Sequence, residues 1–145
     1  MYKISEIRVS YINRSTHRVK ITSSDGAYKL LESNWDKDII DFQEEFKVLL
    51  LNRANFVLGI YNMSRGGATA TIADAKIIFS VALKCHASAI ILAHNHPSGN
   101  NKPSEVDKKL TRTLIEAGKL LDILVLDHII ITSTNYFSFA DTGLM

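Results

Sequence analysis

Two apolar runs separated by a short polar segment constrain the fold most strongly. FKVLLL occupies residues 46–51 and FVLGIY residues 56–61, with NRAN between them. Four residues between two strand-like runs suit a β-hairpin. A third run, ASAIILAH at residues 87–94, is short and apolar throughout, as expected of a buried strand. A β-sheet is therefore predicted at the centre of the chain.

Helical periodicity appears on both sides of the third run. One helix is predicted to start at Asp74 as N-cap, and its apolar positions are Ile77, Ile78, Val81, Ala82 and Cys85. A second is predicted to start near Ser104, and its apolar positions are Val106, Leu110, Leu114, Ala117 and Leu121. SRGGATAT (64–71) predicts a loop, and ILVLDHIIIT (123–132) and YFSFA (136–140) predict the last strands. This order predicts an α/β or α+β domain, with a mixed β-sheet flanked by helices.

The first part of the chain is predicted to form a small leading unit over residues 1–37. IRVSYI (7–12) and RVKITS (18–23) have strand-like residues, and DGAYKLLESNW (25–35) predicts a turn and a short helix. The main domain is expected over residues 38–145.

Composition narrows the class of protein. A chain of 145 residues suits a compact domain with a core of its own. No apolar run approaches the roughly 20 residues of a membrane helix, and MYKISEIRVS does not resemble a signal peptide. Cys85 is the single cysteine, so no internal disulfide forms, and a cytoplasmic protein is expected. Lys plus Arg is 17 against 15 for Asp plus Glu, and this small excess gives no reason to expect direct nucleic-acid binding.

The stretch LAHNHPSGNNKPSEVDKKLT (92–111) holds the residues with the clearest chemistry. His94 and His96 are two apart, so on an extended chain both imidazoles face the same side. Asp107, in the first turn of the next helix, is placed to add a carboxylate oxygen. Two imidazoles and a carboxylate suit a divalent metal, and three protein ligands are typical of a catalytic zinc site with an open position.

A purely structural interpretation competes with the metal site. Ser104 and Asp107 match a capping box, which satisfies N–H groups at the start of a helix. Taken alone, the residues leave an even contest between a metal ligand and a helix cap for Asp107.

A hydrolytic metal site also needs a general base, and two neighbouring glutamates are candidates. Strand alternation places Glu44 with Phe46, and Glu45 with Lys47 on the opposite face. This favours Glu44 as the inward carboxylate and predicts Lys47 as a solvent-facing partner of Glu45. The alternative is that both glutamates are solvated at a strand end.

Together these residues resemble a known motif. A glutamate before a strand, then His-x-His-Pro, then Ser-x-x-Asp, is similar to the JAMM motif of JAB/MPN metalloproteases. HNHPSG, PS, D and T, followed by LDHIII and YFSFAD, resemble the RadC branch over about residues 40–145. The resemblance implies a JAB1/MPN fold of the cytidine deaminase-like kind, with one zinc ion per chain bound by His94, His96 and Asp107. It also implies Glu44 as catalytic base and Ser104 as the serine that assists the oxyanion.

Three functions follow as hypotheses. The first is a zinc-dependent hydrolase that cleaves an amide or isopeptide bond in a peptide or protein substrate. The second is a non-catalytic MPN interaction module, and the third is a factor associated with DNA repair, which rests on the RadC name alone. A homo-oligomer is an open option for partners. Asp127 and His128 are expected either to orient a ligand or to form a structural pair.

Overall fold

A five-stranded mixed sheet forms the centre of the protein. The computed structural model describes residues 1–68 and 72–145. The strands are β1 (Glu45–Leu51), β2 (Val57–Arg65), β3 (Ala89–Asn95), β4 (Leu124–Ile131) and β5 (Tyr136–Ser138). Their spatial order is β2-β1-β3-β4-β5, with β3 and β4 parallel and the other neighbours antiparallel. The predicted hairpin and the mixed sheet are confirmed.

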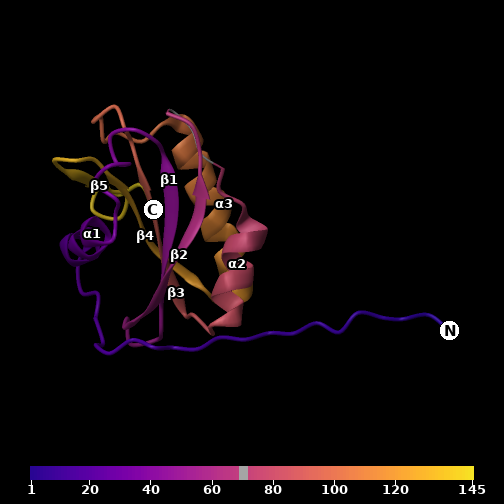
Figure 1. Ribbon diagram of the computed structural model, residues 1–145. Helices are drawn as coiled ribbons and strands as arrows, with labels where there is room; N and C mark the ends of the chain where they lie inside the picture. Colours follow the sequence, from indigo (N-terminus) through magenta and orange to yellow (C-terminus); the bar gives the residue numbers. More distant parts are fainter. Residues whose placement is uncertain (69–71) are drawn as a thin grey trace.

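Helices cover both faces of this sheet, with α1 on one side and α2 and α3 on the other (Figure 1). Their bounds are α1 (Ser24–Ser33), α2 (Ala75–Lys84) and α3 (Glu105–Leu121). Side chains of Ser23, Asp74 and Ser104 cap the three helices by accepting hydrogen bonds from backbone N–H groups of the first turn. The predicted starts at Asp74 and Ser104 are therefore confirmed.

Strand alternation divides the core into two apolar clusters, one for each face. Phe46, Val48 and Leu50 of β1 pack toward α2 and α3, in the cluster that contains Leu114. Leu49 and Leu51 face the other way and share a cluster with residues of α1. Burying one large aliphatic side chain contributes about 1.5–3 kcal/mol to the stability of the fold. Because β1 buries such side chains on both faces, it stabilises both layers.

The leading segment differs from its prediction. Residues 7–12 and 18–23 do not form strands, and residues 1–20 are exposed (Figure 1). An isolated antiparallel bridge between Lys20 and Phe56 is the sheet-like pairing found there. Strand-like residues need a partner strand to bond their backbone, and the segment has none along residues 7–12. The boundary at residue 37 stays a prediction, although one apolar cluster joins Leu31 of α1 to the sheet.

The apolar face predicted for α3 is buried in its middle and exposed at both ends. Leu114 in the middle is fully buried, but Val106 is 76% exposed and Leu121 is 41% exposed. Helical periodicity identifies the stripe without showing where the sheet beneath it ends.

In the described parts of the chain, 1–68 and 72–145, no helix has the length and apolar character required to cross a membrane. Residues 69–71 of the predicted loop lie outside those parts.

Candidate metal centre

The end of β3 brings the predicted site residues together. Antiparallel pairing sets Phe46 opposite His94, so Glu44, two residues before Phe46, reaches the same end of the sheet. His96 follows β3 directly. Asn95 between the histidines points to the other face, where its side chain accepts a hydrogen bond from the Glu45 N–H at 2.7 Å. The same amide donates to the carbonyl oxygens of residues 40 and 43. Asn95 therefore ties the start of β1 to the end of β3.

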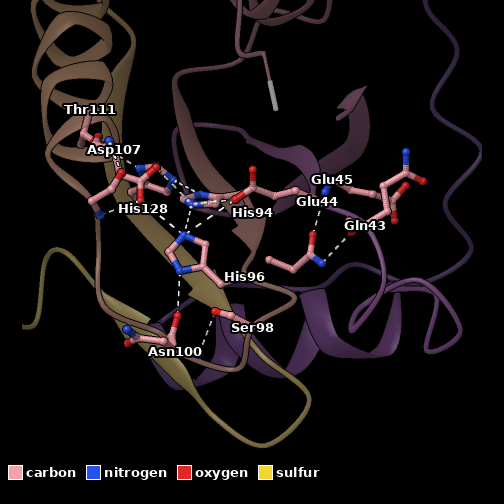
Figure 2. A network of polar contacts seen from close by, with 12 residues as sticks. Gln43, Glu44, Glu45, His94, His96, Ser98, Asn100, Asp107, Thr111 and His128 are labelled. Carbon is pink, nitrogen blue, oxygen red and sulfur yellow. Dashed lines mark hydrogen bonds and ion pairs between the residues drawn. The ribbon is translucent and has the colours of Figure 1, made fainter. Parts of the chain in front are cut away.

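Four side chains converge within hydrogen-bonding or ion-pair distance (Figure 2). The Nε2 atoms of His94 and His96 lie 3.0 Å apart. Asp107 places Oδ1 at 3.3 Å from His94 Nε2 and Oδ2 at 3.3 Å from His96 Nε2. Glu44 Oε1 lies farther away, at 4.0 Å from His94 Nε2 and 3.8 Å from His96 Nε2.

These separations fit a small divalent metal ion. Bonds of about 2.0–2.1 Å in a tetrahedral zinc site place neighbouring ligand atoms roughly 3.3 Å apart. Glu44, His94 and His96 form a group whose ligand atoms all lie within 4.8 Å of one another, which is compatible with a metal ion. Asp107 and Glu44 are both candidates for the third metal ligand. The shorter distances from Asp107 to both histidines favour Asp107.

Charge holds the cluster together. Burial acts to raise the pKa of Asp107, but hydrogen bonds from His94 and His96 outweigh it and hold that pKa well below its usual range. Burial acts to lower the pKa of His96, but bonds to Asp107 and to the Asn100 carbonyl raise it overall. For Glu44, burial dominates and raises the pKa. Asp107 is therefore held in the ionised form that a metal ligand requires.

Comparison with known proteins identifies the fold family. The family model of the RadC-like JAB domain matches residues 21–144. The chain belongs to this family. Its curated relatives include proteins named UPF0758 protein from three bacteria. The Flavobacterium johnsoniae protein is 43% identical over 127 residues, which cover 86% of this chain and 53% of that protein.

The other two relatives give the same picture. The Porphyromonas gingivalis protein is 46% identical over 129 residues, covering 88% of this chain and 56% of its own length. The Alkaliphilus metalliredigens protein is 43% identical over 140 residues, covering 95% and 58%. The RadC-like chain thus spans a little over half the length of these relatives.

Asp107 of this RadC-like domain makes both of the contacts that the sequence left as alternatives. Its Oδ2 accepts a hydrogen bond from the Ser104 N–H at 2.9 Å, and the Asp107 N–H donates to Ser104 Oγ at 3.0 Å. This is a complete capping box. The same carboxylate contacts both histidines, so the capping box holds it in place beside them.

A chain of hydrogen bonds behind His94 fixes the orientation of that ring. His94 Nδ1 lies 2.8 Å from His128 Nε2, and His128 Nδ1 lies 2.7 Å from Thr111 Oγ1. The Thr111 hydroxyl donates to the carbonyl oxygen of Asp107 at 2.7 Å. A metal at His94 Nε2 requires the proton on His94 Nδ1, which then donates to His128 Nε2. His128 must then carry its own proton on Nδ1 and donate it to Thr111. With all donors pointing the same way along the chain, every group in it has a hydrogen-bond partner.

His128 suits this role because it is neutral. It is fully buried, and burial lowers the pKa of its imidazole well below the ordinary value. The sequence offered His128 as an orienting residue, whereas Thr111 was recognised as part of the RadC-like motif but given no role. The signal for Thr111 is its position four residues after Asp107, on the same face of a helix. Asp127 is structural: it accepts hydrogen bonds from the Ser138 hydroxyl and the backbone N–H of Ala140.

The two neighbouring glutamates lie on opposite faces, as alternation predicted, but the expected partner of Glu45 was wrong. Arg65 donates to Glu45 Oε2 through Nε and Nη2, each at 3.0 Å. Lys47 is buried and donates to the Asn62 side chain at 2.8 Å. The reason is that β2 covers this end of β1, so Lys47 and Glu45 find partners on the neighbouring strand and not in solvent.

The group of imidazole and carboxylate side chains opens into a cleft of about 460 Å³. Glu44, His94, His96 and Asp107 line it, together with Ser104 and side chains from the loop after β3. This volume is in the range of small-molecule and peptide sites. The cluster is therefore largely buried, yet it can be reached from the cleft.

Proposed function

We propose that this RadC-like domain is a metal-dependent hydrolase of the JAMM type that cleaves an amide or isopeptide bond in a peptide or protein. The observation that carries the proposal is the arrangement of two imidazoles and one carboxylate at 3.0–3.3 Å, with a second carboxylate at 3.8–4.0 Å. Three ligands and a nearby base are what metal-assisted hydrolysis requires.

In this proposal His94, His96 and Asp107 hold one zinc ion. When bound, zinc supplies a Lewis acid that makes a water acidic near neutral pH and polarises a carbonyl group. The chain orients these ligands through the capping box at Asp107 and through the hydrogen bonds that link His94 to His128 and His128 to Thr111.

Glu44 is the proposed general base. Oε1 accepts a proton from the attacking water and later returns it to the nitrogen of the leaving amine. Burial raises the pKa of Glu44, which makes it a stronger base than an exposed carboxylate. Glu44 also stands farther from the histidines than Asp107 does, which suits a group that handles the proton without acting as a ligand.

Ser104 is the proposed oxyanion donor. Its oxygen accepts the Asp107 N–H, and a serine hydroxyl keeps one hydrogen to donate. From its position on the cleft wall, that hydrogen stabilises the negative charge that develops on the substrate carbonyl oxygen.

The experiment that tests the proposal is metal analysis of the purified protein. We expect about one zinc per chain in the native protein and a near-complete loss in His96→Ala. His17→Ala is the matched control, because His17 is exposed in the leading segment and should leave zinc unchanged. A native protein that binds no zinc even when zinc is supplied, or a His96→Ala protein that retains it, contradicts the proposal.

A further inference from the structure

One wall of the metal cleft carries exposed apolar side chains. Val106 is 76% exposed in the first turn of α3, and Leu110, one turn later, is partly buried. Both line the cleft. Residues four apart lie side by side on a helix, so Val106 and Leu110 form a continuous strip. Asp107 lies beside this strip on the same helix.

The structure of α3 by itself gives no reason for an apolar residue at position 106. Its neighbours Ser104, Glu105 and Asp107 are polar, and the buried part of the helix begins further along. Val106 has a β-branched side chain, which lowers helix propensity. A single exposed apolar side chain is ordinary on a protein surface. Val106, however, continues into Leu110 within the cleft of the proposed active site.

Other elements also line the cleft. Ala68 and Pro97 add further apolar surface. The loop after β3 contributes the polar side chains Ser98, Asn100 and Lys102. One wall thus suits an aliphatic side chain, and the loop offers hydrogen-bonding groups to a peptide backbone.

Building on the proposed hydrolase, we infer that the cleft selects a substrate with an aliphatic side chain next to the scissile amide, seated against Val106 and Leu110. Glycine at that position would leave the strip in contact with water. An acidic side chain there would exchange its hydration for contact with apolar surface. Substrates such as leucyl or isoleucyl peptides are therefore preferred over glycyl and aspartyl ones.

The test uses hydroxamates, which bind zinc without being cleaved. N-acetylleucine and N-acetylglycine hydroxamates differ in the side chain on the acyl side of the metal-binding group. Succinyl hydroxamates with and without an isobutyl group on the carbon next to the amide carbonyl present a leucine-like or a glycine-like side chain at the first position on the amine side. Acetohydroxamate has no side chain and reports on the metal alone. Affinities for the zinc-supplied protein are measured by titration calorimetry.

We expect the leucine compound of at least one pair to bind about tenfold or more tightly than its glycine counterpart. Val106→Asp should abolish this difference and leave acetohydroxamate affinity unchanged. An acidic residue is favourable in the first turn of a helix, so the variant should fold. Leu120→Asp is the matched control: Leu120 is 89% exposed on the same helix, roughly 20 Å along its axis from Val106, and should keep the preference.

Two failures can be told apart. Acetohydroxamate binding without any preference for leucine in either pair overturns the inference alone. A preference for leucine that persists in Val106→Asp also overturns the inference alone, because a surface other than Val106 must then cause that preference. A zinc-supplied protein that does not bind acetohydroxamate overturns the proposed hydrolase and this inference with it.

Discussion

The two faces of the sheet treat the start of β1 in opposite ways. On the face covered by α2 and α3, Glu44 is buried beside two histidines and a second carboxylate. On the face covered by α1, Glu45 is equally buried but forms a two-bonded ion pair with Arg65. Two adjacent glutamates thus have opposite surroundings, because neighbouring side chains on a strand point to opposite sides.

The two buried carboxylates differ in the partners that surround them. A buried charge is tolerated when a fixed partner neutralises it, and Arg65 provides that partner for Glu45. The opposite face has two carboxylates beside two histidines. Imidazole and carboxylate groups are metal ligands, so this face suits a bound metal ion, whereas on the other face Arg65 neutralises Glu45.

The largest expected effect separates the two glutamates by activity. Glu44→Gln should lower hydrolysis about 10²–10⁴-fold, the usual contribution of a general base, while the protein keeps its zinc. Glu45→Gln is the control and should remain close to the native rate. Turnover is measured by mass spectrometry on a peptide library that the native protein cleaves. Equal losses in both variants would remove the functional distinction between the faces.

The next effect concerns the hydrogen bonds behind His94. Thr111→Val removes the acceptor for His128 Nδ1 and should weaken zinc affinity about 10–100-fold. Thr111→Ser keeps the hydroxyl and should bind zinc almost as the native protein does. Affinity is measured by competition with a zinc chelator. Equal zinc affinity of the valine and native proteins would show that these bonds do not position the ligand.

On the opposite face, the effect should appear in stability and not in metal binding. Arg65→Ala leaves Glu45 buried without its partner and should lower the free energy of unfolding by about 1–3 kcal/mol. Breaking a fully buried ion pair costs more than this. The smaller loss is expected because the Arg65 side chain is 56% exposed. Denaturant unfolding and zinc content are measured together. A loss of zinc in this variant would show that the two faces are coupled.

The smallest expected effect compares two helix caps. Ser104 caps α3 on the metal face, and Ser23 caps α1 on the other by accepting the Gly26 N–H at 3.0 Å. Replacing either serine by alanine should cost about 1 kcal/mol of stability. Of the two variants, only Ser104→Ala should also lose hydrolysis, because Ser104 lines the cleft and Ser23 does not. A rate that falls equally in both variants would reduce Ser104 to a helix cap.

Sequence patterns predicted the elements of the sheet well, because β1 and β3 are short, apolar and buried along their whole length. The same patterns failed at residues 7–12, where strand-like residues find no neighbouring strand. Strand formation depends on a partner that propensity does not encode. The exposed Val106 illustrates the same limit for a helix, since periodicity does not reveal where the covering layer ends.

The site was partly readable for a similar reason. The spacing of His94 and His96 fixes their common direction, and alternation fixes which glutamate shares it. Their convergence with Asp107 depends on the pairing of β1 with β3 and on the packing of α3, which are tertiary facts. Thr111 and Asn95 belong to the quoted motif but received no role, because their importance lies in hydrogen bonds to distant groups.

The placement of α3 also affects how the protein is assembled. This helix is the crossover between the parallel strands β3 and β4, and it carries Asp107 in its first turn. Parallel strands need such a long connection, and non-local pairing of this kind is slow. His94 and His96 are close in sequence, whereas the proposed third ligand joins them only when the helix packs against the sheet. High-affinity metal capture should therefore be a late event in folding, and zinc uptake should report completion of the native state.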